Sequence, residues 1–161
     1  MAESAATPAA LGILADDPAS VAWAREILTR ELAFATLVVA GDARGPDQWS
    51  HEIAQGMVAP IDCERWRVAG HVERWTALPG CRGGWSFAGR WDGGGVSIDP
   101  KRRPLERNVE MIAAHDTGPG GPNVRLVALH HALAKTHGTA HTVGLARKAG
   151  IDVTEYTWRA P

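Results

Sequence analysis

TLVVAGDARGPD, the segment from Thr36 to Asp47, carries the clearest fold signal in this 161-residue chain. Its first part, Thr36–Ala40, is short, uncharged and rich in β-branched residues, which is typical of a buried strand. The segment then passes through Gly41 and Gly45 to Pro46, and proline is favoured as the first residue of a helix. A buried strand, a glycine-containing turn and a helix in this order predict an α/β protein.

The same alternation continues on both sides of this segment. Apolar spacing and helix-boundary residues predict helices over Pro18–Ala33, from Pro46 onwards, over Pro104–His115 and over Thr139–Gly150. Apolar runs predict further strands at Ala9–Leu14, Val58–Cys63, Val124–Leu129 and Ile151–Tyr156. We therefore expect a single domain, residues 1–161, in which a mostly parallel sheet of about five strands carries helices on both faces.

Residues 70–103 interrupt this alternation. The segment is rich in glycine and contains Trp75, Trp85 and Trp91. A loop of this length in a compact domain is usually functional or disordered, and three tryptophans argue against disorder. We expect an ordered insertion, a loop or a hairpin, folded over the domain. Its tryptophans fit either a small additional core or a lid that stacks on a planar ligand ring.

Composition limits the cellular setting. A formal net charge of −1 provides no overall attraction to nucleic acid or membranes. No apolar run approaches the roughly 20 residues of a membrane span, and the N-terminus lacks the pattern of a secretory signal. The two cysteines, Cys63 and Cys81, do not suggest a disulfide scaffold. We therefore expect a cytoplasmic protein.

Two turns hold the residues best suited to bind an anion: Gly41–Asp47 and His137–Thr139. Each follows a predicted strand and precedes a predicted helix, so glycine allows close backbone approach and the helix N-terminus offers unpaired N–H groups. Arg44 adds a fork of donors that suits phosphate. Ordinary tight turns fit the same spacing, so both interpretations remain open.

The helix predicted at Pro104–His115 carries a polar residue on its apolar stripe. Leu105, Asn108 and Ile112 fall on one face at helical spacing. A buried asparagine needs partners, which are either loop backbone or a ligand at the edge of the sheet. Arg107 faces solvent or reaches the same place. The preceding basic run, Lys101–Arg103, either closes over phosphates or is a solvated charge cluster.

The histidines late in the chain do not form a metal-binding pattern. His137 and His141 are four residues apart, but the first is expected in a loop, and no thiolate or carboxylate completes a zinc set. His130 and His131 follow a predicted strand and fit either a ligand contact or loop packing. We expect no metal site and no cofactor.

Together these motifs resemble the SLOG superfamily, which contains Rossmann-like domains related to Smf/DprA proteins and to LOG phosphoribohydrolases. The resemblance is greatest to the small YspA/YpsA-like proteins of unknown function found in bacteria and phages. It rests on GDARGPD (Gly41–Asp47), ERNVEM (Glu106–Met111) and HGTAHTVGLARKAGIDV (His137–Val153), with Trp66 after the third predicted strand. It spans about residues 36–66 and 104–156.

The resemblance implies a three-layer Rossmann-like domain with a ligand site at the carboxyl edge of its sheet. The implied ligand-binding residues are Gly41, Asp42, Arg44, Gly45, Asp47, Arg107, Asn108, Gly138 and Thr139. Two departures from the family pattern concern chemistry. Asp42 stands where the family has glycine, and Ala140-His141-Thr142 stands where LOG enzymes have the glutamates that serve ribose cleavage.

The leading functional hypothesis is therefore binding of a nucleotide or nucleotide-derived ligand, by a sensor or a sequestering protein. The alternative is a nucleotide hydrolase of the LOG phosphoribohydrolase type, which would cleave an N-glycosidic bond with Asp47 as the candidate acid–base residue. DprA-like binding of single-stranded nucleic acid is disfavoured by the near-neutral charge. The resemblance also makes a homodimer a candidate assembly, because related domains often pair through helices that flank the sheet.

Overall fold

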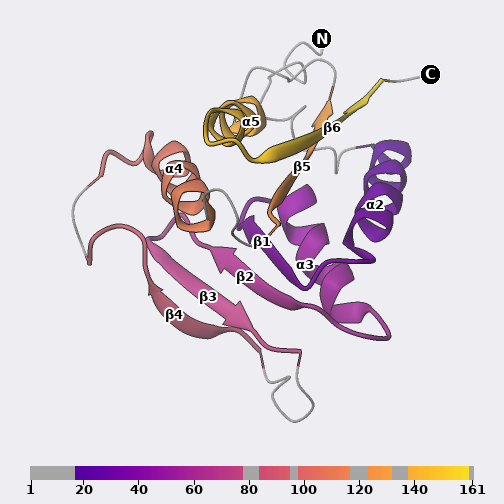
Figure 1. Cartoon of the computed structure of the whole chain (residues 1–161), viewed down its shortest axis with the longest axis horizontal. Helices are drawn as coiled ribbons and strands as arrows, with labels where there is room; N and C mark the ends of the chain where they lie inside the picture. The colour runs from indigo at the N-terminus through magenta and orange to yellow at the C-terminus, as the bar shows by residue number, and fades with distance from the viewer. Residues whose placement is uncertain (1–16, 78–83, 95–97, 117–122, 132–137, 160–161) are drawn as a thin grey trace.

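The computed structural model describes residues 17–77, 84–94, 98–116, 123–131 and 138–159 (Figure 1). The predicted strand at Ala9–Leu14, together with Cys81 and His137, lies outside these residues. The described elements, in chain order, are α2 (Pro18–Leu32), β1 (Leu37–Gly41), α3 (Pro46–Gly56), β2 (Asp62–Trp66), β3 (His71–Trp75), β4 (Ser86–Arg90), α4 (Arg103–His115), β5 (Arg125–His131), α5 (Gly138–Lys148) and β6 (Asp152–Trp158).

The α/β class is confirmed, but the sheet differs from the prediction. The described strands form a four-stranded sheet in the order β1-β2-β3-β4 and a separate pair, β5-β6. β1 and β2 are parallel, with Gly41 opposite Trp66, and β5 and β6 are also parallel. β3 and β4 extend the larger sheet in antiparallel fashion. The expected mostly parallel sheet is therefore replaced, in the described part of the chain, by a mixed sheet and a parallel pair.

Strands β3 and β4 lie within the segment expected to be a loop or a hairpin. A bulge in the pairing of β3 with β4 leaves Ala88 of β4 without a residue opposite it, whereas β3 stays in register with β2. The buried residues of β3, Val72 and Trp75, are three positions apart and lie on opposite faces, Val72 with Trp66 and Trp75 with Cys63. This spacing hides the strand from a search for strict alternation.

The prediction for β2 is wrong by about four residues. The apolar run Val58–Cys63 was expected to form the strand, yet Val58 is fully exposed and the strand covers Asp62–Trp66. Its sequence, DCERW, includes a buried glutamate, Glu64, and a half-buried arginine, Arg65. Each of these charged side chains has a partner on its own face of the strand. Because buried positions are therefore not all apolar, apolar periodicity does not predict this strand.

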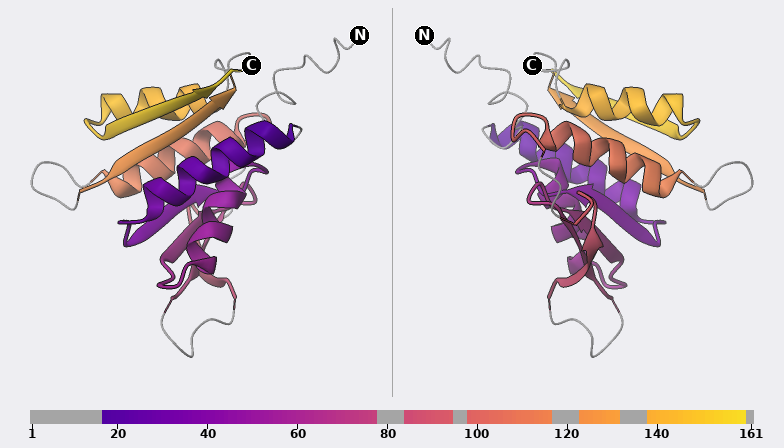
Figure 2. Two further views of the ribbon diagram at one scale, coloured as in Figure 1. Left: turned by 90° about the vertical axis from the view of Figure 1, so that its right-hand side faces the viewer. Right: turned by 90° about the vertical axis from the view of Figure 1, so that its left-hand side faces the viewer.

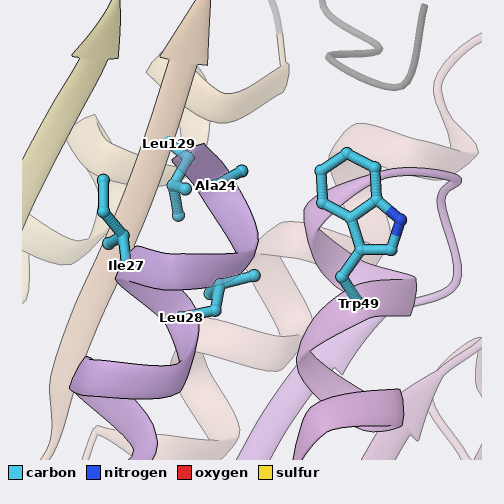
Figure 3. Close-up of a cluster of buried hydrophobic side chains, with 5 residues drawn as sticks. All are labelled: Ala24, Ile27, Leu28, Trp49 and Leu129. Carbon is cyan, nitrogen blue, oxygen red and sulfur yellow. The ribbon is translucent and has the colours of Figure 1, made fainter. Parts of the chain in front are cut away.

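Helices α3 and α4 lie on opposite faces of the larger sheet. Val38 of β1 packs with Ala54 of α3, whereas the next residue, Val39, packs against the same cluster as Met111 of α4. Figure 2 shows this layering: α2 is nearest the viewer in the left view and α4 in the right view. A further core cluster joins α2, α3 and β5 and is drawn in Figure 3 (Ala24, Ile27, Leu28, Trp49 and Leu129).

The turn between β2 and β3 depends on a glycine. Gly70 has a φ of +121°, and a Cβ placed there would lie 2.1 Å from Oδ2 of Asp92. Asp92 is buried and pairs with Arg90 and Arg103, which ties this turn to β4 and to α4. The turn therefore packs against a carboxylate that two arginines, one from β4 and one from α4, hold in place.

We expect Gly70→Ala to lower the free energy of unfolding by more than about 2 kcal/mol, because the methyl group forces Asp92 from its place as well as straining the backbone. Urea denaturation measures this loss. Gly94→Ala is the matched control, since Gly94 has a φ of +80° but open space around it, and its loss should be only about 1–2 kcal/mol. Equal losses for the two variants would contradict the role of Asp92.

Candidate functional site

A buried ion pair closes the carboxyl end of β1. Nη1 of Arg107, on α4, donates to Oδ1 of Asp42 over 2.8 Å. The other carboxylate oxygen of Asp42 accepts from the backbone N–H of Val68 over 3.2 Å and lies 3.2 Å from Nε of Arg67. Arg107 is only 6% exposed. One carboxylate thus connects β1, α4 and the turn after β2.

Gly41 leaves room for two of the protein's own side chains. A Cβ at this position would lie 2.7 Å from Oδ2 of Asp47 and 2.8 Å from Cζ of Arg107. The sequence suggested that this glycine admits a bulky anion to the backbone. The structure instead places a carboxylate and a guanidinium against it, so that the groups expected to bind a ligand contact one another.

Asp47 holds the turn that it follows. Its carboxylate accepts a hydrogen bond from the N–H of Ala43 over 3.3 Å. Burial raises the pKa of Asp47, an effect that Arg107 opposes. Helix α3 begins beyond Gly45, whose φ of +97° favours glycine and which supplies no side-chain cap. The first turn of α3 therefore carries the Asp47 carboxylate, which stabilises the turn before it, and backbone N–H groups that no N-cap side chain pairs.

Asn108 orients Arg107. Its Oδ1 accepts from Nε and Nη2 of Arg107 over 3.2 and 3.1 Å. The predicted stripe of α4 is confirmed in part: Asn108 is buried and Ile112 half-buried, whereas Leu105 is 40% exposed and Arg107 is buried. The helix turns its polar pair inwards because Asp42 and Asn108 compensate the buried guanidinium.

A pocket of about 270 Å³ opens beside Gly41 and Asp42. One wall is the side of α3 that carries Gln48, His51, Glu52 and Gln55. The other consists of Arg65 and Arg67, at the carboxyl end of β2, and of Trp85. Arg65 and Arg67 point to the same side as Cys63 because strand side chains alternate. Among the candidate ligand-binding residues of the sequence, only Gly41 and Asp42 line this pocket.

His51 is the buried polar group of this pocket. It is 5% exposed, and neither ring nitrogen has a hydrogen-bond partner among the described residues. Burial, assisted by the charge of Arg65, lowers its pKa to about 4, although the nearby backbone of Ala40 and Gly41 opposes this shift without forming a hydrogen bond of good geometry. The imidazole is therefore neutral at pH 7.

Trp85 and the two arginines form the opposite wall. The guanidinium carbon of Arg65 lies 4.1 Å from the centre of the Trp85 ring, and the imidazole of His51 meets that ring edge-to-face at 5.0 Å. Glu73 lies 2.8 Å from Arg65 and 3.4 Å from Arg67. The side chain of Arg67 nevertheless remains 37% exposed, so it can contact a ligand.

Other residues highlighted by the sequence lie elsewhere. Gly138 and Thr139 are exposed at the start of α5, and Arg44 is exposed in the turn before α3. Of the three tryptophans considered as a lid, Trp75 and Trp91 are each 8% exposed and belong to core clusters. Arg103, from the basic run, donates to the Val68 carbonyl over 2.9 Å. It thus stabilises the turn after β2.

The opposite face of β2 carries a second polar network. Glu64 accepts from Nε1 of Trp66 over 2.7 Å and lies 2.7 Å from Nε2 of His115. These contacts, with the charge of Arg74, outweigh burial and lower the pKa of Glu64 to about 2. On another element, His130 is buried and contacts Glu155 over 2.9 Å. These histidines stabilise the fold through carboxylate partners.

The described residues contain no group of three or more His, Cys, Asp or Glu side chains arranged to hold a metal ion. Within the same ranges, no helix has the length and apolar content needed to cross a membrane.

Sequence reasoning missed His51, Arg65 and Arg67. His51 lies one helical turn after Asp47, so the two share a side of α3, and this spacing is the only signal that could have linked them. Arg65 and Arg67 alternate along β2, but the strand itself had been placed too early. No sequence pattern links Trp85 to the histidine or to the two arginines.

Comparisons with family models, with curated proteins and with solved structures found no match to this chain. The resemblance to the SLOG superfamily therefore stays a prediction.

We expect Asp42→Asn to lower the free energy of unfolding by about 3 kcal/mol, because it leaves the buried guanidinium of Arg107 without its counter-charge. Chemical denaturation at pH 7 measures the change. Glu106→Gln is the control, since it removes a carboxylate that pairs with Arg102 on the exposed side of α4 and should change stability by less than about 1 kcal/mol. Similar effects for both variants would show that the Asp42–Arg107 pair has no special role.

Proposed function

We propose that this protein binds a nucleotide or a nucleotide-derived ligand in the pocket beside Gly41, as a sensor or a sequestering protein. The observation that carries the proposal is the combination of groups in one pocket at the carboxyl ends of β1 and β2: the Asp42 carboxylate, a cation on Arg67 and an indole ring on Trp85. Phosphate, ribose and base are recognised by these kinds of group.

The size of the pocket favours a single nucleotide. Its volume of about 270 Å³ lies just below the range of roughly 300–1,000 Å³ for small-molecule sites. Oδ2 of Asp42 accepts from Val68 and lies 3.2 Å from Nε of Arg67. Oδ1, however, contacts Arg107 alone among the described residues and has a second lone pair. It therefore retains the capacity to accept hydrogen bonds from ribose hydroxyls, as acidic residues at strand ends do in dinucleotide-binding folds.

The rim of this pocket is preorganised. The turn after β2 donates through the N–H of Val68 to Asp42, and its carbonyl groups accept from Arg103 and from the indole of Trp91. A rim fixed in this way loses little conformational entropy when a ligand binds. This favours specific binding of a small molecule.

A thermal-shift screen of nucleoside mono-, di- and triphosphates, followed by calorimetry of those that stabilise the protein, tests the proposal. We expect at least one to bind, and Arg67→Met to weaken its affinity at least about ten-fold, equivalent to about 1.4 kcal/mol. The arginine supplies a charged donor to the ligand, and this contact is lost in the variant.

Arg74→Met is the matched control. Arg74 also pairs with a carboxylate, that of Glu64, but on the opposite face of the sheet. Its removal should leave affinity within about two-fold of the original. Absence of any response across the screen, or equal losses in the two variants, would reject binding in this pocket.

A second candidate function is hydrolysis of the N-glycosidic bond of a nucleotide. The observation in its favour is the raised pKa of Asp47, since a carboxyl group that stays protonated at higher pH is a better general acid. Asp47 does not line the pocket, however, and its carboxylate is engaged with Ala43 and faces Gly41. Hydrolysis is therefore the less supported candidate.

Chromatography of nucleoside monophosphates incubated with the protein tests this second function by the appearance of free base. If Asp47 is the acid, we expect Asp47→Asn to reduce base release at least about 100-fold. The asparagine oxygen can still accept from Ala43, so the thermal unfolding midpoint serves as the control for folding. Undetectable release by the original protein would exclude hydrolysis of these substrates.

A further inference from the structure

His51 is a buried polar side chain without a partner. Leaving a buried hydrogen-bonding group unpaired costs about 1–3 kcal/mol, so such groups are rare in folded proteins and call for an explanation. His51 is 95% buried within its own chain, with 5% of its surface exposed, and it lines the pocket beside Gly41. Neither nitrogen makes a hydrogen bond of good geometry to a described residue, although the backbone of Ala40 and Gly41 lies near the ring. A ligand that enters this pocket can satisfy them.

The charge of His51 restricts the chemistry of that ligand. Burial and the adjacent Arg65 keep the imidazole neutral at pH 7, so it offers one N–H donor and one lone-pair acceptor rather than a positive charge. Neutral partners with matching donors and acceptors suit this ring better than phosphate does. The cations of the pocket come from β2 and the residue after it, and Arg65 lies near enough to His51 for its charge to act on the ring.

The neighbours of His51 on the α3 wall are two glutamines and Glu52, whose carboxylate accepts from the amide of Gln48 over 3.2 Å. Gln48 and Gln55 line the same wall, and their amides add further donors and acceptors. The two glutamines are seven residues apart, which corresponds to about 10 Å along a helix. Trp85 meets the imidazole edge-to-face, with the ring centres 5.0 Å apart, and adds an aromatic ring directly beside it. Amide and imidazole groups beside an aromatic ring are suited to a flat, uncharged heterocycle.

We infer that the α3 side of this pocket is a base subsite, in which His51, supported by Gln48 and Gln55, hydrogen-bonds the edge of a neutral nucleobase or a similar heterocycle. The inference rests on the proposed function and specifies it: the heterocycle lies against α3, and the sugar or phosphate lies towards Asp42 and Arg67. His51 is thus a specificity-determining residue, and binding requires the base as well as the phosphate.

Calorimetry with three matched probes tests this subsite: a nucleoside monophosphate that binds, its nucleoside, and ribose 5-phosphate. We expect the nucleoside to bind measurably and ribose 5-phosphate to bind at least ten-fold more weakly than the nucleotide. In His51→Phe, which keeps a planar ring but has no nitrogen, the nucleotide should bind at least ten-fold more weakly. His51→Asn, which keeps a donor and an acceptor, should lose less.

The stability of the ligand-free protein separates recognition from a structural role. His51→Phe removes unpaired nitrogens, so its unfolding midpoint should equal or exceed that of the original protein at pH 7. Between about pH 6.5 and 4 the unfolded chain protonates His51 while the folded chain does not. The original protein should therefore lose stability relative to His51→Phe as the pH falls through this range. A lower midpoint for His51→Phe at pH 7 would overturn the inference.

The binding outcomes distinguish the inference from the function on which it rests. If ribose 5-phosphate binds as tightly as the nucleotide, or if His51→Phe leaves all affinities unchanged, the base subsite is wrong while nucleotide-type binding stands. If His51→Phe weakens ribose 5-phosphate and nucleotide equally, His51 acts on the phosphate side and the inference also fails. If no probe binds, both proposals fall.

Discussion

The buried pair between Asp42 and Arg107 is the interaction on which the arrangement of this protein depends. Arg107 reaches from α4 across Gly41 to the end of β1, and Asp42 extends the connection to the turn after β2. A buried charge is tolerated only when it is paired and hydrogen-bonded, and Asn108 completes the set for this guanidinium. The absence of a side chain at Gly41 is what allows Asp47 and Arg107 to approach the same backbone.

Strand β2 separates two polar networks. Its alternation directs Arg65 and Arg67 to the α3 side, where they line the pocket, while Glu64 points to the α4 side and meets Trp66 and His115. A central strand with charges on both faces is stable only because each charge has a partner. These ion pairs also position the cations and the indole of Trp85 that form one wall of the candidate site.

The elements with strong local chemistry were predictable. Helix α2 begins at Pro18 after the cap residue Asp17, and α3 begins at Pro46, as the sequence indicates. Strands β3 and β2 were not, because β3 buries one apolar residue on each of its faces and β2 carries charged residues on both. The inward face of α4 was predicted in part: Asn108 is buried as expected, whereas Leu105 is exposed and the ion pair at the end of β1 turns Arg107 inwards.

By itself, the sequence determined the α/β class and the strand–turn–helix at Thr36–Asp47, because caps, glycines and apolar runs act locally. Its motifs also singled out Gly41, Asp42, Asp47, Arg107 and Asn108 as candidates. Only the tertiary structure decided that these residues satisfy one another, with the pocket beside them. It also brought His51, Arg67 and Trp85 together from a helix, the end of one strand and the approach to another. Contacts between residues so distant in the chain depend on which charged groups pair when helices pack on the sheet. The order of residues within one helix or strand does not specify those pairs.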